Sequence, residues 1–280
     1  MSVTSQEHPR PARVRFGHLW VDAVTLEEAL SAIARLVERG EGGVIYTPNV
    51  DHVVVADESE AFRRAYARAD LSLCDGAPIL WTSGWLGLRL PAKVSGSDLF
   101  LPLMRLAAQR GLRVYLLGAG EGVAAEAARR LSAEMGVTIA GFASPRVGLE
   151  PLADEDEVVS RVASARPDLV LACLGAPKAE LWLDRVRDRL RPAVGVAVGA
   201  SLDFYVGIVR RAPRLVQRLG LEWLFRLLQE PRRLAGRYLV RDPKFALILL
   251  RTLFEPRSGR LLEAAQPPRT GDRALGDAEE

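Results

Sequence analysis

The chain has 280 residues, of which 49% are hydrophobic, 26% charged and 6% aromatic, and its formal net charge is +3. This length suits one α/β domain with an appendage, or two small domains, and it allows a sizeable core without disulfides or metals. The composition excludes a wholly disordered chain, a collagen-like repeat and a disulfide scaffold. Cys74 and Cys173 lie in apolar runs, so we expect buried, reduced thiols in a reducing compartment.

The first elements follow residues 1–12, which lack the apolar stretch of a signal peptide and are expected to form a disordered tail. Thr25 and Glu28 have the spacing of a capping box, which predicts a helix that Gly40 can end. The alternation of strand and helix patterns that follows predicts an α/β domain over residues 13–209, with a Rossmann-like parallel sheet and helices on both faces. Short apolar strands are predicted at residues 44–47, 71–74, 113–117, 137–141, 168–173 and 194–198.

The C-terminal part of the chain differs in charge and in pattern. Residues 210–260 hold 13 Lys or Arg and 4 Asp or Glu, a net +9, whereas residues 1–209 and 261–280 each sum to −3. We therefore predict a basic helical appendage over residues 210–255 and a disordered tail over residues 256–280. The charge indicates an anionic partner, such as lipid headgroups, nucleic acid or phosphate; the alternative is a solvated, Arg-rich helical face.

No membrane-spanning segment is expected, because the longest late apolar run, residues 245–250, is far shorter than a spanning helix. The appendage does interleave apolar and aromatic residues with arginines, the composition of an interfacial helix. The sequence therefore predicts a protein that lies on a membrane without crossing it.

Polar and glycine-rich segments follow the predicted strands at the points where the strands end. Because the carboxyl ends of parallel strands meet at one edge of a sheet, these segments are expected to form a nucleotide pocket there. The segments are Thr47-Pro-Asn49, Asp75-Gly76, Gly118-Ala-Gly120, Gly175-Ala-Pro-Lys178 and Gly199-Ala-Ser201.

Two of these segments have alternative interpretations. The turn at residues 118–122 suits a phosphate at a helix N-terminus, but it equally suits a plain strand-to-helix turn. It is not the full dinucleotide fingerprint, since Val123 stands at the last glycine position and no acidic residue follows the next strand. Asp75 is either the cap of a helix beginning at Ala77 or a carboxylate exposed to the pocket that acts as a general base.

No metal site is predicted. Asp154-Glu-Asp156 matches a D-x-D pattern, but it lies in an acidic run ahead of a helical pattern, where it complements a helix N-terminus. The three histidines, His8, His18 and His52, lack metal-ligand spacing.

Taken together, the motifs resemble the WecG/TagA/CpsF family of glycosyltransferases, which act in bacterial cell-surface polymer synthesis. The resemblance runs from about Val14 to Phe254. It rests on eight segments in order: residues 47–52, 73–76, 94–98, 141–145, 175–180, 198–204, 211–213 and 221–231.

This resemblance implies an inverting, metal-independent transfer of a sugar, often of the N-acetylmannosamine type, from a UDP-sugar to a polyprenyl-diphosphate-linked sugar. It implies no cofactor and no nucleic-acid partner. Because the implied acceptor is a membrane lipid, the protein is expected to be cytoplasmic and to associate peripherally with the anionic inner face of the plasma membrane. Relatives can self-associate, so the oligomeric state stays open.

The resemblance also assigns candidate residues. Asp75 matches the proposed general base, Thr47 and Asn49 match residues close to it, and Lys93 stands where many relatives carry arginine. The residues expected to bind the UDP-sugar are Gly118, Gly120, Glu121, Gly122, Phe142, Gly175, Pro177, Lys178, Glu180, Ser201 and Asp203. The residues expected to contact the acceptor or the membrane are Arg210, Arg211, Arg226, Arg233 and Arg237.

Two departures from the family pattern bear on the donor. Relatives usually have Gln at the position of Ala179 and often a polar residue at that of Ala143. Both changes remove hydrogen-bonding groups, so the identity of the donor sugar stays open. Two other function classes are also considered: an NAD-dependent oxidoreductase, which the missing acidic residue disfavours, and a non-catalytic binder of lipid or nucleic acid, which would not need Asp75, Asn49 and Lys178 to converge.

Overall fold

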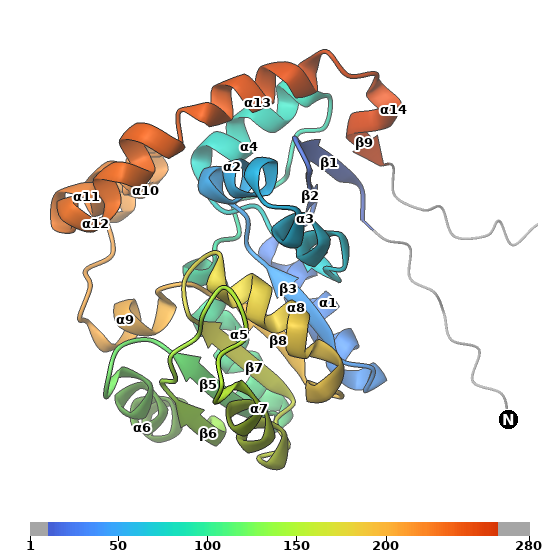
Figure 1. Cartoon of the computed structure of the whole chain (residues 1–280). Helices are drawn as coiled ribbons and strands as arrows, with labels where there is room; N and C mark the ends of the chain where they lie inside the picture. The colour runs from blue at the N-terminus through green and yellow to red at the C-terminus, as the bar shows by residue number, and fades with distance from the viewer. Residues whose placement is uncertain (1–10, 263–280) are drawn as a thin grey trace, which may run out of the picture.

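The computed structural model describes residues 11–262, whose centre is a six-stranded parallel sheet in the order β4-β3-β8-β7-β5-β6 (Figure 1). All strand pairs in this sheet are parallel. The predicted α/β fold with a Rossmann-like parallel sheet is therefore confirmed. The strands are β3 (Gly43–Tyr46), β4 (Leu71–Ser72), β5 (Arg113–Gly118), β6 (Thr138–Ala143), β7 (Leu169–Cys173) and β8 (Val194–Ala197).

Helices cover both faces of the sheet, because alternate residues of its buried strands supply two separate apolar clusters. Val114 and Leu116 belong to one cluster, whereas Tyr115 and Leu117 belong to the other. The first cluster packs against α1 (Leu26–Arg39), α5 (Gly96–Arg110) and α6 (Val123–Met135). The second packs against α2 (Val50–Glu58), α3 (Glu60–Ala67), α7 (Glu155–Ser164) and α8 (Lys178–Leu190).

Helix α1 illustrates how local sequence sets these boundaries. The Thr25 side chain accepts the backbone N–H of Glu28, and the Glu28 carboxylate accepts that of Thr25, as predicted. Gly40 ends the helix with φ 67°, a left-handed conformation that suits glycine. Cys74 and Cys173 are both buried and free, which is also as predicted.

A second, small sheet was not predicted. β1 (Arg13–Phe16) and β2 (Leu19–Asp22) form a hairpin, and β9 (Leu261–Leu262) pairs with β1 after the short helix α14 (Arg257–Arg260). The expectation of a disordered tail from residue 256 is therefore wrong for residues 257–262, because β1 offers an edge that the returning chain pairs with. The rest of that tail, and residues 1–10 of the expected N-terminal tail, lie outside the described residues.

The appendage, residues 210–255, is helical as predicted and arches over the edge of the body (Figure 1). It contains α10 (Arg214–Arg218), α11 (Glu222–Gln229), α12 (Pro231–Ala235), the π-helical η2 (Gly236–Arg241) and α13 (Lys244–Leu253). Three shorter elements follow strand exits: α4 (Ala77–Ser83) and the 3-10 turn η1 (Gly84–Leu86) come after β4, and α9 (Ser201–Val206) comes after β8.

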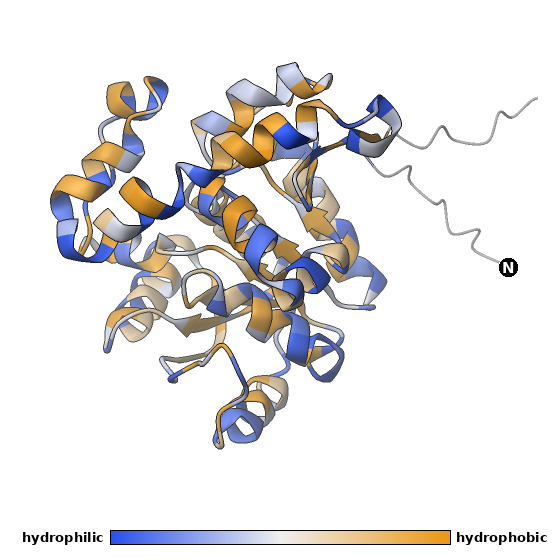
Figure 2. Ribbon diagram, turned by 45° about the horizontal axis from the view of Figure 1, so that its top comes forward, coloured by the Kyte–Doolittle hydropathy of each residue, from blue (hydrophilic) through white to orange (hydrophobic). Residues whose placement is uncertain are grey.

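Helix α13 ties the appendage to the body. Phe245 stacks on Phe16 of β1 with ring centroids 6.3 Å apart, and the Thr252 hydroxyl accepts the backbone N–H of Gly17 at 3.0 Å. Figure 2 shows that apolar residues nonetheless run along the appendage as well as through the body. None of the described helices has the length and the hydropathy that crossing a bilayer would require.

Candidate active site

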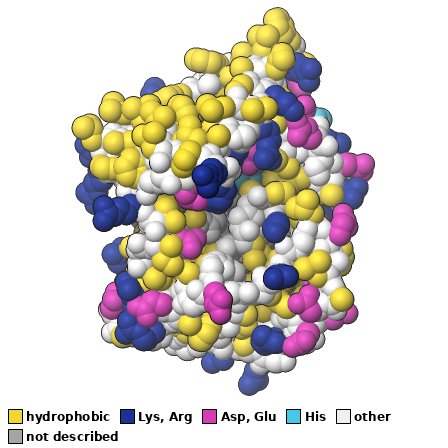
Figure 3. All heavy atoms as spheres, turned by 60° about the vertical axis from the view of Figure 1, so that its left-hand side comes forward, with side chains coloured by type: hydrophobic (Ala, Val, Ile, Leu, Met, Phe, Trp, Pro, Cys, Tyr) yellow, Lys and Arg dark blue, Asp and Glu magenta, His cyan; other side chains and the backbone are white. Residues whose placement is uncertain are grey.

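A cavity of about 280 Å³ lies between the body and the appendage. Both parts of the chain supply its walls, so its shape depends on where the appendage sits. Its lining residues are Asn49, Val50, Asp75, Gly76, Pro78, Ser95, Ser97 and Phe204 of the body, with Glu222, Trp223, Arg226, Arg237, Tyr238 and Asp242 of the appendage. In Figure 3, which turns the appendage toward the viewer, the surface is hollowed below an expanse of hydrophobic side chains.

Asp75 lies in this cavity, three residues after the end of β4. Its backbone N–H donates to the carbonyl of Pro48 at 2.9 Å, which joins the exits of β4 and β3. Gly76, with φ 104°, precedes α4, and no side chain caps that helix. The helix-cap interpretation of Asp75 is therefore wrong, and the carboxylate is free to face the cavity.

The surroundings of Asp75 favour its neutral form. Burial raises the pKa of Asp75 above its ordinary value, with Lys93 opposing and Glu222 reinforcing the shift. A carboxylate deprived of water is a stronger base than one in solution, so it takes a proton from a neighbouring hydroxyl more readily.

Asn49 joins the body to the appendage at the cavity edge. It caps α2, and its Oδ1 accepts the backbone N–H groups of Asp51 at 3.1 Å and His52 at 3.4 Å. Arg237 of η2 donates Nη2–H to the same oxygen at 2.9 Å, and its Nε lies 3.3 Å from Oδ2 of the buried Asp51. Arg241 pairs with Asp51 as well, at 3.3 Å.

Arg226 supplies the second cation of the cavity wall. Its guanidinium lies over the ring of Phe204, 5.4 Å from the centroid, and its Nη2 lies 4.0 Å from Oε1 of Glu230. Trp223 and Tyr238 pack edge to face beside it, with ring centroids 5.9 Å apart. The cavity therefore combines two carboxyl groups of raised pKa, Asp75 and Asp242, with the carboxylate of Glu222, two guanidinium groups and an aromatic wall.

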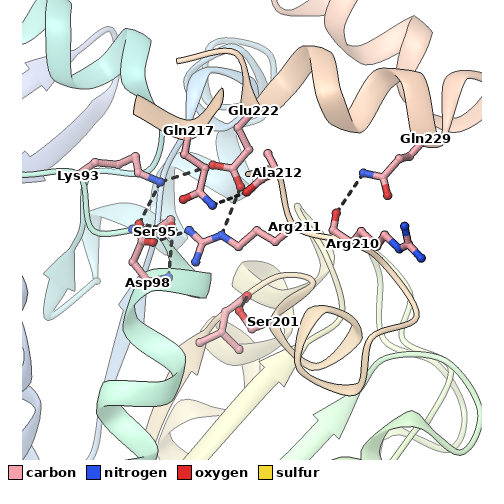
Figure 4. Close-up of polar contacts among 11 residues, drawn as sticks. Lys93, Ser95, Asp98, Ser201, Arg210, Arg211, Ala212, Gln217, Glu222 and Gln229 are labelled. Atoms are coloured by element: carbon pink, nitrogen blue, oxygen red, sulfur yellow. Dashed lines mark hydrogen bonds and ion pairs between the residues drawn. The ribbon is translucent and has the colours of Figure 1, made fainter. Parts of the chain in front are cut away.

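Lys93 is not among the lining residues of the cavity; it belongs to a network of four charges, with Asp98, Arg211 and Glu222, between body and appendage (Figure 4). Its Nζ lies 2.9 Å from Asp98 Oδ2 and 3.6 Å from Glu222 Oε2. Arg211 pairs with the same two carboxylates from the other side, through Nη2 to Asp98 and through Nε to Glu222. Burial disfavours charge on Lys93, yet Asp75, Asp98 and Glu222 hold its pKa above the ordinary value.

A second cavity, of about 520 Å³, lies at the turn after β5. Gly118 has φ 99°, and a Cβ there would lie 2.8 Å from the carbonyl group of Cys173, so only glycine fits. The Ser144 hydroxyl donates to the Gly118 carbonyl at 3.0 Å and fixes the turn. The cavity is lined by Ala119, Glu121, Gly122, Ala125, Phe142, Ala143, Ser144, Pro145 and Arg161.

The candidate donor residues divide between this cavity and other places. Glu121, Gly122 and Phe142 line it, and the Phe142 side chain is half exposed. Gly120 lies in the same turn, while Gly175 and Pro177 lead into α8, where Lys178 is exposed. None of these last four is among the lining residues of either cavity.

Thr47, Glu180 and Ser201, by contrast, are buried and serve the interior. Thr47 donates to the carbonyl of Ala197 at 3.3 Å, and Ser201 donates to that of Val198 at 2.5 Å. The Glu180 carboxylate lies 3.2 Å from Nε2 of His52. These three side chains brace the strand exits and face neither cavity.

The remaining candidates lie around the appendage. Asp203 of α9 has a pKa raised by burial, with Arg233 and Arg226 opposing the shift. Arg233 is exposed and pairs with Glu230, and Arg210 is exposed. Of the five predicted appendage arginines, Arg226 and Arg237 line the cavity, and Arg211 reaches it through Glu222.

Sequence reasoning missed several lining residues. Glu222 and Trp223 lie inside the segment at residues 221–231, which contributes to the family resemblance but assigns no role to either residue. Tyr238 and Asp242 carry no motif, and burial raises the pKa of Asp242 to about 6. The acidic run at residues 154–156 opens α7 as predicted, where Glu155 pairs with Arg185 at 2.6 Å.

A parallel α/β sheet with a desolvated carboxylate and convergent cations at its carboxyl edge is typical of enzymes that act on phosphorylated ligands. Comparison with known proteins defines the class further. The chain belongs to the WecG/TagA/CpsF family of glycosyl transferases, whose model matches residues 14–259. The resemblance inferred from the motifs is confirmed.

Two relatives are similar over most of their length. One, from Bacillus spizizenii, is 32% identical over 216 residues, which cover 77% of this chain and 81% of the relative. The other, from Bacillus subtilis, is 30% identical over 216 residues, which cover 77% and 82%. Both are N-acetylglucosaminyldiphosphoundecaprenol N-acetyl-beta-D-mannosaminyltransferases.

Proposed function

We propose that this glycosyltransferase moves a sugar of the N-acetylmannosamine type from a UDP-sugar to a polyprenyl-diphosphate-linked sugar, with inversion and without a metal ion, in the synthesis of a cell-surface polymer. The observation that carries the proposal is the position of Asp75, a carboxylate of raised pKa in a cavity that Arg226 and Arg237 help to enclose. The similarity to the two mannosaminyltransferases supports the substrate class.

The reaction is a single displacement. Asp75 takes the proton of the acceptor hydroxyl, whose oxygen forms a bond to the anomeric carbon as the bond from that carbon to the diphosphate breaks. The electron pair of the broken bond leaves with UDP. Arg226 and Arg237 stabilise the negative charge that develops on the leaving diphosphate, and preorganised cations in a dry site do this at little reorganisation cost.

The nucleoside part of the donor is assigned to the turn at residues 118–122 and the loop at residues 175–178. The cavity beside the turn, with its half-exposed Phe142, supports this assignment. Among residues 11–262, no group of three or more His, Cys, Asp or Glu side chains is arranged to hold a metal ion, and the arginines offer the positive charge that a metal otherwise provides.

The appendage is proposed to lie on the anionic inner face of the plasma membrane. Exposed apolar side chains lie on it next to exposed arginines such as Arg214, Arg218 and Arg232. This combination favours the interface between headgroups and acyl chains. The exposed apolar residues are Leu215, Leu219, Leu221, Trp223, Leu224, Leu228, Leu239, Val240, Leu247, Leu250 and Phe254, and Figure 3 shows hydrophobic side chains gathered on that side.

A donor screen tests the proposed function. UDP-sugars are offered with a short-chain polyprenyl-diphosphate N-acetylglucosamine, and UDP release is followed with and without that acceptor. We expect acceptor-dependent release with UDP-N-acetylmannosamine or a close analogue. Acceptor-dependent release with none of the donors contradicts the proposal, and parallel titrations with NAD and DNA distinguish the two other function classes.

A further inference from the structure

The two carboxylates of the network in Figure 4, Asp98 and Glu222, differ in how closely their partners approach them. Asp98 accepts the Ser95 hydroxyl at 2.7 Å, lies 2.9 Å from Lys93 Nζ and also pairs with Arg211. Burial opposes its ionisation, but Lys93 and the hydrogen bonds of Ser95 and Arg211 lower the pKa of Asp98 to about 2. Glu222 approaches the same cations only at 3.6 and 3.5 Å, distances too long for good hydrogen bonds.

The two cations therefore keep unused donors. The ammonium of Lys93 carries three N–H groups, of which Asp98 Oδ2 at 2.9 Å accepts one, and the buried Arg211 Nε has no hydrogen-bond acceptor of good geometry among residues 11–262. Leaving a buried N–H without an acceptor is costly, and more so for a charged group. Glu222 and Ser95 line the cavity that contains Asp75, whereas Lys93 and Arg211 do not, so an anion in that cavity reaches the two cations only where Glu222 now lies.

Glu222 has the geometry of a stand-in for a bound anion. Its two oxygens face one cation each, Oε2 toward Lys93 and Oε1 toward Arg211, as two oxygens of a phosphate group would. It also adds negative charge to a cavity that already contains Asp75. While Glu222 stays in place, an incoming diphosphate meets neutralised cations and a repelling carboxylate.

We propose that Lys93 and Arg211 form a phosphate-binding subsite for the diphosphate of a substrate, and that Glu222 occupies this subsite as an internal competitor until the substrate displaces it. The identity of the anion as a diphosphate rests on the proposed function. Glu222 is the first residue of α11, so its displacement couples phosphate binding to the position of that helix.

Inorganic pyrophosphate is the probe, and its affinity for the full-length protein is measured by titration calorimetry at fixed ionic strength. Glu222→Gln keeps the shape of the side chain and removes its charge. We expect the dissociation constant to fall about fivefold or more, because the competitor and its repulsion are lost together. Glu222→Ala is the second variant, and we expect a change in the same direction.

Two controls test whether tighter pyrophosphate binding comes from the proposed subsite or only from the more positive net charge of the variant. Glu255→Gln makes the same change of charge at a residue that pairs with Arg15 and does not line the cavity, so affinity should change less than twofold. In an Arg211→Met background, Glu222→Gln should give a clearly smaller gain, because only Lys93 of the subsite then remains. The proposal is overturned if Glu222→Gln leaves affinity unchanged or weaker, or if the gain is just as large without Arg211. These outcomes are independent of sugar transfer, which the donor screen tests separately.

Discussion

Arg237 of the appendage donates a hydrogen bond of 2.9 Å to Oδ1 of Asn49, the residue that caps α2 on the body. This contact joins two segments separated by 188 residues at the edge of the cavity that holds Asp75. Asn49 already accepts two backbone N–H groups at the start of α2, so its side chain is fixed before any substrate arrives. The appendage and the strand exits therefore share one polar joint, and the position of Asn49 depends on both.

Replacing Arg237 by Met should loosen this joint. The buried Asp51 would keep Arg241 but lose Arg237, which we expect to cost about 1–3 kcal/mol in the free energy of unfolding. Denaturant unfolding measures the loss, and hydrogen exchange should rise in η2. Arg232→Met, at an exposed position of the same appendage, is the matched control. Equal stability of the two variants would show that the joint does not hold the appendage.

Replacing Asp75 by Asn should lower kcat by about 10²–10⁴-fold, because an amide cannot take the proton of the acceptor hydroxyl. Affinity for UDP should not fall, since the variant leaves the assigned nucleoside turn and the cations of the cavity in place and removes a negative charge. In the unmodified protein, the acid limb of kcat/KM should lie above pH 3.8, since burial raises the pKa of Asp75 and the base works only when ionised. An acid limb at or below that pH, or full activity of the variant, argues against this role.

The fold was predictable because its signals are local and repeated. Each parallel strand is a short apolar run ended by polar or glycine-rich residues, and Thr25 and Gly40 mark the ends of α1 in the sequence itself. The hairpin of β1 and β2 and its pairing with β9 were missed. That pairing depends on an edge formed by Val14, 247 residues from its partner Leu261, and nothing in either segment alone indicates the other.

The site was predictable only in part, because the sequence shows the type of each residue and its place in the chain but not which groups its side chain contacts. Asp75 and Asn49 follow strands, so their convergence at one edge follows from the parallel sheet. Thr47 lies in the same motif as Asn49, and Glu180 lies in the segment at residues 175–180, but these two side chains turn inward, toward Ala197 and His52. Which side of a turn a residue faces is decided by packing.

The turn that follows β5 offers a matched pair of glycines. Gly118→Ala would place Cβ against the Cys173 carbonyl at a positive φ, so we expect a loss of about 2–4 kcal/mol in the free energy of unfolding and a higher KM for the donor. Gly122 also has a positive φ, 74°, but open space around it, so Gly122→Ala should cost about 1–2 kcal/mol. Equal losses for the two variants would mean that the turn relaxes away from β7.

Asp242 should make stability depend on pH. Burial raises its folded-state pKa from 3.8 to about 6, so between these values the folded state binds a proton that the unfolded state does not. The free energy of unfolding should therefore fall as pH rises from 4 to 6, and the penalty should persist above pH 6. Asp242→Asn should raise Tm relative to the unmodified protein more at pH 7.5 than at pH 4.5. Asp156→Asn, at an exposed carboxylate, should show no such difference.

Vesicle binding distinguishes a membrane surface from a solvated basic face. Arg214 and Arg218 are exposed on α10, close in sequence to the exposed apolar Leu215 and Leu219. Each basic residue near an anionic bilayer contributes about 1 kcal/mol, so Arg214→Gln with Arg218→Gln should weaken sedimentation with anionic vesicles about tenfold or more at low salt. Arg39→Gln with Arg105→Gln makes the same change of charge on exposed positions of α1 and α5 and should have little effect. Equal weakening by the two pairs would mean that total charge, and not the surface of the appendage, governs binding.

Replacing Leu215 and Leu219 by Ser should weaken vesicle binding even at high salt, because salt does not screen the insertion of apolar side chains.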